Sequence, residues 1–275
     1  MRNNQRRLGH GPAHQPSPPA PVAEMAFTAP TEFVELPSRG EFYTEDHPLY
    51  KQETVEIKFM TAKDEDILTS EALLKKGLAV DRLLDSLLVA DVDPASLLVG
   101  DRSAILIAAR ASAYGSDYKV SIRCSGCQTE NEFVFDLNTA TIYDDCFEKE
   151  FLHEERVVFD EGTQTFDVVL PVSNVSVGLA LIDGRKEKRF SEKDNNKNRV
   201  TSLLSTILVK VNEDTDFANV RDFIETMPAK DSRYIRNLYP KLVPTVKLLE
   251  KFSCLNCFLA EETEVPLTAE FFWPE

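Results

Sequence analysis

Two short cysteine motifs decide the fold: Cys124-Ser-Gly-Cys127 and Cys254-Leu-Asn-Cys257. Each motif is followed by a segment in which polar and apolar residues alternate, as they do in a half-buried strand. Two tight turns that each offer two thiolates can complete a tetrahedron around one zinc ion, with bonds of about 2.3 Å. The pattern therefore predicts a zinc ribbon, with a structural zinc as cofactor, because four protein ligands leave no open position for a substrate.

The distance between the two motifs is unusual for a zinc ribbon. Residues 128–253 separate them, so the metal would join the middle of the chain to its C-terminal end, with a helical insert between. Two other interpretations stay open. The motifs could be redox dithiols, although neither lies in a βαβ context, or they could be buried thiols without a metal. The remaining cysteine, Cys146, is expected to be a buried thiol.

Outward from these motifs, the chain is predicted to be an α+β protein with helical clusters, short antiparallel strands and a split four-cysteine zinc ribbon. Its first residues are rich in Pro, Gln, Asn and Arg and hold almost no apolar side chain, which favours disorder there. We divide the chain into 1–30, a disordered Pro-rich tail; 31–60, an extended arm and first strand; 61–116, a helical region; 117–172 together with 250–275, the zinc-ribbon and strand region; and 173–249, a second strand-plus-helix region.

Helix signals are clear in two places. Thr61 followed by Asp64 approaches a capping box, for a helix that is expected to run to Lys76 and stop at the glycine after it. Asp101 is expected to cap an apolar helix that ends near Gly115. Further elements are expected as helices over 83–88, 200–211, 217–227 and 232–239, and as strands over 54–60, 118–123, 132–136, 165–170, 175–182 and 262–267.

The charge of the chain argues against two classes of partner. Its 275 residues include 31 Lys and Arg and 46 Asp and Glu, for a net charge of −15. Residues 1–40 carry four basic and three acidic side chains, so the region after them carries −16. Phosphates and anionic lipids attract clustered Lys and Arg, and no apolar run approaches the ~18 residues of a membrane span. We therefore expect neither a nucleic-acid partner nor a membrane partner.

No familiar catalytic motif is present, and the chain is not expected to be an enzyme. The sequence holds no P-loop, no GxGxxG, no GxSxG and no HExxH. His153 lies among charged neighbours and could serve an acid–base site, but the pattern strongly favours a solvated charged strand. The acidic runs 64–66 and 144–145 could bind a divalent cation, and a first helical turn explains such a run without one.

Two surface features are candidates for partner binding. Arg233 and Arg236 belong to a basic island that is either ordinary helix surface or a docking face for an acidic partner. Phe271, Phe272 and Trp273 near the C-terminal end either cover the core of the ribbon or anchor into a neighbouring subunit, since interfaces favour aromatic anchors.

Several strings, taken in order, resemble the baseplate hub subunit family of T-even-like contractile-tailed bacteriophages over roughly residues 34–274. The strings are ELPSRG (35–40), VEIKFMTAKDEDILTS (55–70), LLKKG (73–77), DRLL (81–84), LLVGDRSAILIAAR (97–110), AYG (113–115), CSGC (124–127), MPAKDSR (227–233), the second CxxC and VPL…FFWP (265–274). The Pro-rich tail and the asparagine-rich stretch 194–198 fall outside the resemblance.

The resemblance implies a structural protein of the virion that folds in the host cytoplasm and lies in the tail baseplate. Its partners would be other baseplate, hub, spike, wedge or tail-tube proteins, and a homo-oligomer is left open. Family members are hub parts or factors that help the hub to assemble, so a hub assembly chaperone is the main alternative. A hydrolytic enzyme is the weaker one. The family brings no catalytic residues, and its paired CxxC motifs correspond to the four cysteines above.

Overall fold

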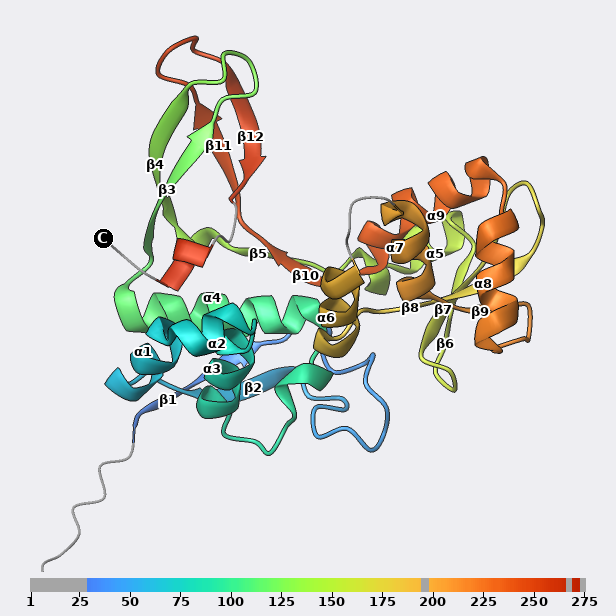
Figure 1. Ribbon diagram of the computed structural model, residues 1–275, viewed down its shortest axis with the longest axis horizontal. Helices are drawn as coiled ribbons and strands as arrows, with labels where there is room; N and C mark the ends of the chain where they lie inside the picture. Colours follow the sequence, from blue (N-terminus) through green and yellow to red (C-terminus); the bar gives the residue numbers. More distant parts are fainter. Residues whose placement is uncertain (1–28, 194–197, 266–268, 273–275) are drawn as a thin grey trace, which may run out of the picture.

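The computed structural model describes residues 29–193, 198–265 and 269–272 (Figure 1). Strand pairings within these residues are antiparallel, and helices cluster around short strands, so the predicted α+β class is confirmed. All but the last two residues of the predicted tail 1–30 lie outside the described residues, and so does Trp273.

The N-terminal half is a two-stranded sheet covered by helices. Strand β1 (Thr31–Glu35) pairs with β2 (Thr54–Lys58), and the apolar residues Val55 and Ile57 of β2 are buried as their alternation predicts. The helices of this half are α1 (Ala62–Thr69), α2 (Glu71–Lys75), α3 (Ala79–Leu87) and α4 (Val99–Tyr114). The apolar face of α3 is buried, whereas α2 buries no residue.

The predicted helix over 61–76 is interrupted. Its capping box is confirmed, since the backbone N and the hydroxyl of Thr61 donate to the Asp64 carboxylate at 2.8 and 2.7 Å. The prediction of one continuous helix is wrong, because Ser70 takes an extended backbone conformation and separates α1 from α2. Serine favours caps and turns over helix interiors, and α2 has no buried face that would hold it in line with α1.

Asp101 does not cap α4, contrary to the prediction. The helix begins two residues earlier, after Leu98, and Asp101 lies in its first turn with no exposed surface. Its carboxylate accepts hydrogen bonds from the backbone N and the hydroxyl of Ser38, at 3.0 and 2.6 Å, and from the hydroxyl of Tyr43 at 2.7 Å. The Tyr43 hydroxyl in turn accepts from the backbone N of Leu98 at 3.0 Å. One buried carboxylate thus fixes the N-terminal arm to α4.

A four-stranded sheet in the order β6-β7-β8-β9 lies within residues 157–211, across the expected boundary at 172/173. Its strands are β6 (Val157–Asp160), β7 (Thr165–Val169), β8 (Ser176–Ala180) and β9 (Leu208–Val211). The helices around it are α5 (Lys149–Glu154), α6 (Gly184–Lys193), α7 (Arg199–Ile207), α8 (Phe217–Thr226) and α9 (Ala229–Leu242). Figure 1 shows this part at the opposite end of the molecule from α1.

The predicted helix over 200–211 changes to a strand at Leu208. Helix α7 ends at Ile207, and the next four residues form β9, which pairs with β8. This short segment contains two β-branched valines, Val209 and Val211, and pairing with β8 satisfies its backbone groups. The local pattern of apolar residues cannot reveal this pairing, because β8 lies about thirty residues earlier in the chain.

A two-stranded link carries the chain back toward the cysteine motifs. Strand β5 (Thr141–Tyr143) pairs with β10 (Thr245–Lys247), and the residues just before β10 cross α4 at Gly100. A Cβ at Gly100 would lie 2.0 Å from the Pro244 carbonyl oxygen, so the crossing requires glycine. The short 3₁₀ segments are η1 (Pro94–Ser96), η2 (Leu137–Thr139), η3 (Asp145–Phe147) and η4 (Ala269–Phe272).

Candidate metal centre

Two antiparallel hairpins carry the cysteine motifs. The first consists of β3 (Asp117–Arg123) and β4 (Glu130–Asp136), and the second of β11 (Leu249–Ser253) and β12 (Ala260–Glu264). They form two separate sheets that project together from α4, with both cysteine loops at the far end (Figure 1). The strands predicted beside both motifs are therefore present, although the predicted end of the last strand at residue 267 lies outside the described residues.

The two cysteine loops share one backbone geometry. We call Cys124–Thr129 the first knuckle and Cys254–Leu259 the second. In each, the N–H of the leading cysteine donates to the carbonyl five residues on at 2.9 Å, and its carbonyl accepts from the N–H four residues on at 3.0 Å. The N–H two residues on lies 3.4 Å from the leading Sγ. Gln128 and Phe258 occupy the matching left-handed position, with φ of 62° and 59°.

This geometry brings the four sulfur atoms together. The Sγ atoms of Cys124 and Cys257 are 3.6 Å apart, those of Cys127 and Cys254 are 3.5 Å apart, and all four lie within 4.8 Å of one another. A tetrahedral zinc with bonds of about 2.3 Å requires sulfur–sulfur separations of about 3.8 Å. A disulfide requires about 2.05 Å, so the sulfurs have the spacing of a metal site and not that of a bonded pair.

The four thiols compete for ionisation. Hydrogen bonds from the Thr129 side chain, then from the Asn256 side chain and the Thr129 backbone, lower the pKa of Cys127 to about 5. For Cys257, the Leu259 backbone hydrogen bond favours the thiolate, but burial and the three neighbouring thiols together raise its pKa to about 12. Thiolates packed this closely repel one another, and a divalent cation is the group that removes such repulsion.

Asn131 supports the cysteine cluster, and sequence reasoning missed it. This residue at the start of β4 is only 5% exposed. Its amide nitrogen lies 3.7 Å from Cys254 Sγ and donates to the Thr129 carbonyl at 2.9 Å, while its oxygen accepts from the Leu255 N–H at 3.0 Å. The alternation of polar and apolar residues in β4 could have identified Asn131 as a buried polar residue. It lies on the same face of the strand as Phe133, whose ring lies 4.8 Å from that of Phe252.

Two of the aromatic candidates at the C-terminal end, Phe271 and Phe272, are buried. Phe271 and Phe272 are 3% and 7% exposed, and the Phe271 ring meets Tyr118 edge to face at 5.1 Å. The carbonyl of Phe271 accepts a hydrogen bond from the buried guanidinium of Arg110 at 2.9 Å. Their burial favours the interpretation as a cover. They cover the junction of α4 with the first hairpin, however, and not the cysteine end of the ribbon.

The other candidates lie apart from the cysteines. Arg233 and Arg236 are exposed, three residues apart on α9. Cys146 is a buried thiol as predicted, and burial raises its pKa to about 12. A surface hollow of about 250 Å³ lies beside His153, and all of its lining residues come from α5. The residues that line this hollow therefore include no side chain from a second element that could form an acid–base pair with His153.

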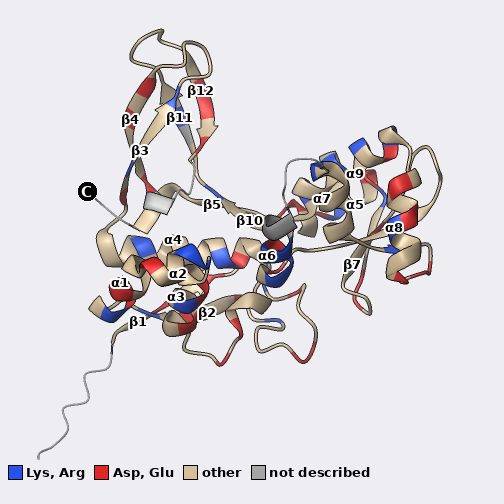
Figure 2. Cartoon of the chain, viewed as in Figure 1, with Lys and Arg blue, Asp and Glu red and all other residues tan. Residues whose placement is uncertain are grey.

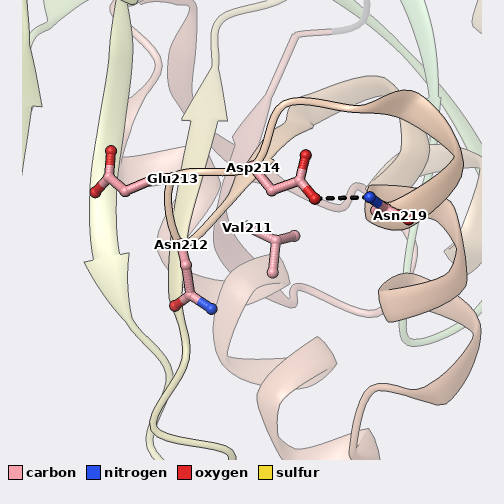
Figure 3. Close-up of a pocket in the computed structure, with 5 residues that line it drawn as sticks. All are labelled: Val211, Asn212, Glu213, Asp214 and Asn219. Atoms are coloured by element: carbon pink, nitrogen blue, oxygen red, sulfur yellow. Dashed lines mark hydrogen bonds between the residues drawn. The ribbon is translucent and has the colours of Figure 1, made fainter.

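A second hollow, of about 560 Å³, lies at the turn between β9 and α8 (Figure 3). Its acidic residues serve the local backbone. The Asp214 carboxylate accepts from the side-chain amide of Asn219 at 2.7 Å and from the N–H of Asp216 at 2.8 Å. The Glu213 side chain points away from Asp214 and Asn219 (Figure 3). The turn thus holds the start of α8, which Asp216 caps through the N–H groups of the first turn.

Comparison with known proteins places the chain in a family. Among the described residues, no helix combines the length and the apolar character that a membrane crossing needs. Neither the curated proteins nor the solved structures yielded a match. A family model described as "T4 bacteriophage base plate protein" matches residues 30–273, which include both cysteine motifs and the arm held by Asp101. The chain therefore belongs to the T4 bacteriophage base plate protein family.

Proposed function

We propose that this protein is a structural component of the baseplate hub of a contractile phage tail. It connects hub, spike, wedge or tail-tube proteins through protein–protein contacts. The observation that carries the proposal is the family match over residues 30–273, which supports a structural role in the phage baseplate. The hub position and the partners rest on the resemblance of the ordered sequence strings.

A structural zinc held by Cys124, Cys127, Cys254 and Cys257 is part of the proposal. The support is geometric: four sulfurs from two knuckles of equal backbone geometry lie within 4.8 Å of one another. The two hairpins belong to separate sheets, so no continuous strand ladder joins them. The metal would fix the C-terminal hairpin against the hairpin in the middle of the chain, and it would do no chemistry, since four thiolates complete its shell.

Charge supports the kind of neighbour that we propose. The region after residue 40 carries −16, which complements basic surfaces on other baseplate proteins. Arg233 and Arg236 form a small exposed basic surface on α9, and we propose that they contact an acidic neighbour. Complementary charges across an interface raise the association rate and select the partner more than they raise the affinity.

The decisive experiment counts this chain in purified tails. Quantitative mass spectrometry of tails from infected cells is expected to find it at a fixed copy number relative to the other baseplate proteins. The alternative, a hub assembly chaperone, predicts that it binds hub proteins in the infected cell and is missing from finished tails. A chain that neither enters tails nor binds any hub protein would contradict both.

A further inference from the structure

The second knuckle exposes apolar side chains at the far end of the ribbon. Leu255 is 76% exposed, Phe258 80% and Leu259 36%. Figure 1 shows this end far from the body of the molecule, so no other described element covers it. Single exposed apolar residues are ordinary, but three within five positions on a projecting tip form a contiguous patch of the kind that marks an interaction site.

The first knuckle shows that the backbone does not need these apolar side chains. It has the same hydrogen bonds and the same left-handed position, yet it carries Ser125, Gln128 and Thr129 where the second carries Leu255, Phe258 and Leu259. Leu259 has a local role, because one of its methyl carbons packs against Gly126. The same geometry therefore forms with polar residues at the positions that match Leu255 and Phe258.

Phe258 also occupies an unfavourable backbone conformation. Its φ of 59° lies in the left-handed region, where a residue with a Cβ atom is disfavoured, and glycine or asparagine is the usual choice. A large aromatic ring at such a position gains nothing from burial when it is 80% exposed. Gln128 takes the same conformation in the first knuckle, so the left-handed turn belongs to both knuckles, and at this position only the exposed aromatic ring distinguishes the second.

The charge of the ribbon selects the kind of partner. Residues 117–136 carry four acidic and two basic side chains, and residues 249–264 carry four and one, for a combined −5. Figure 2 shows the loops of the tip without charge, above strands with acidic segments. A zinc ion with four thiolates would add further negative charge. Anionic lipid and the tip of a second copy would both be repelled, whereas a surface rimmed with Lys and Arg would be attracted.

We propose that Leu255 and Phe258 insert into an apolar pocket of another phage protein, and that Lys and Arg border this pocket. The tip is then the anchor through which the ribbon docks, with the aromatic ring at the centre of the contact and the acidic strands at its rim. This inference rests on the proposed function, because it identifies one of the contacts that such a component makes.

Photo-crosslinking in infected cells tests the contact in the full chain. One variant carries p-benzoylphenylalanine in place of Phe258. The control variant carries it in place of Val158, a β6 residue that is 67% exposed. Position 258 is expected to crosslink to an apolar segment of one phage protein with Lys or Arg beside it, at least tenfold more than position 158. Crosslinks only to a second copy of this chain, or none to protein, would overturn the proposal.

A double variant separates this contact from folding and from the proposed function. Leu255→Ser with Phe258→Gln gives the second knuckle the residues of the first at these two positions and keeps Leu259, so zinc content and melting temperature are expected to stay unchanged. Crosslinking from a probe placed at Gln128, the exposed position of the first knuckle that matches Phe258, is expected to fall at least tenfold in the double variant against the same probe in the wild-type background. Equal crosslinking in the two backgrounds would overturn the docking proposal alone, whether or not wild-type chain is found in tails.

A vesicle assay distinguishes the protein partner from a membrane. Vesicles of phosphatidylglycerol and phosphatidylethanolamine are expected to sediment neither the wild-type chain nor the double variant. Sedimentation of the wild type that the double variant loses would assign the tip to lipid and overturn the proposal.

Discussion

The amide nitrogen of Asn131 lies 3.7 Å from the sulfur of Cys254, although 122 residues separate the two positions in the sequence. The same side chain accepts a hydrogen bond from the N–H next to that cysteine. A single buried amide therefore links β4 to the second knuckle and donates toward a sulfur of the proposed metal site. Contacts of this outer kind orient metal ligands and tune their affinity for the ion.

Asn131→Ala is expected to weaken zinc binding by about tenfold or more, because it removes the donor beside Cys254 and leaves the Leu255 N–H without its acceptor. Competition with a colorimetric chelator measures the affinity. Asn138→Ala, at an exposed position after β4, is the matched control and should bind zinc as the wild type does. Equal zinc affinity in the two variants would show that Asn131 does not support the metal site.

Chelation is expected to loosen the ribbon and leave the rest of the chain folded. The two hairpins share no strand ladder, whereas the large core of the described residues contains none of the four cysteines. Hydrogen exchange after treatment with a strong chelator should therefore speed up in β11 and β12 and stay slow in β7 and β8. Uniform exchange throughout the chain, or no change in β11 and β12, would show that the metal does not act locally.

Cys254→Ser is expected to lower both the zinc content and the melting temperature, because it removes a buried ligand of the cluster. Cys146→Ser is the matched control, since this thiol is equally buried and lies outside the cluster. It should leave the zinc content unchanged. Loss of zinc in the Cys146 variant, or its full retention in the Cys254 variant, would contradict the ligand assignment.

Asp101→Ala is expected to lower the free energy of unfolding by about 3 kcal/mol, since three buried donors of the N-terminal arm then lose their acceptor. Urea unfolding followed by circular dichroism measures it. Ser103→Ala on the same helix, where the hydroxyl bonds only to the carbonyl of Val99, should cost under about 0.5 kcal/mol. Similar losses in both variants would mean that the arm is not held by Asp101.

Asp160 is expected to make the stability of the four-stranded sheet depend on pH. Hydrogen bonds from the Thr163 side chain and then from Lys210 lower the pKa of Asp160 from 3.8 to about 2. A lowered pKa in the folded state means that the carboxylate stabilises the fold above pH 4, and that this contribution disappears as the pH falls from about 4 to 2. Asp160→Asn should therefore melt below the wild type at pH 7, with the difference shrinking over that range.

Ser103→Ala of α4, which changes no ionisable group, offers the control for this pH dependence. Its difference from the wild type should stay constant between pH 4 and pH 2. A constant difference for Asp160→Asn across the whole range would show that the carboxylate does not act through its charge.

Local patterns were sufficient for the elements whose signals lie within a few residues. The capping box at Thr61, the hairpin strands beside Cys124 and the buried alternation of β2 are all visible in the sequence. The meeting of the four cysteines was also predictable, because paired CxxC motifs imply a common metal. The division of the chain into five regions remains a prediction.

The elements that sequence patterns missed depend on distant partners. Leu208 leaves the helical pattern because β8 is available for pairing, and Asp101 is buried because Ser38 and Tyr43 reach it from the arm. Asn131 reads as an ordinary polar strand residue until Cys254 comes within reach of its amide. Tertiary contacts outweighed local preference at these three positions.

X-ray absorption at the zinc edge, on protein purified without chelator, tests the metal centre most directly. One zinc per chain is expected, surrounded by four sulfur atoms at about 2.3 Å. A zinc content near zero, or a first shell that contains nitrogen or oxygen in place of any sulfur, would contradict the four-cysteine zinc centre on which this view of the ribbon depends.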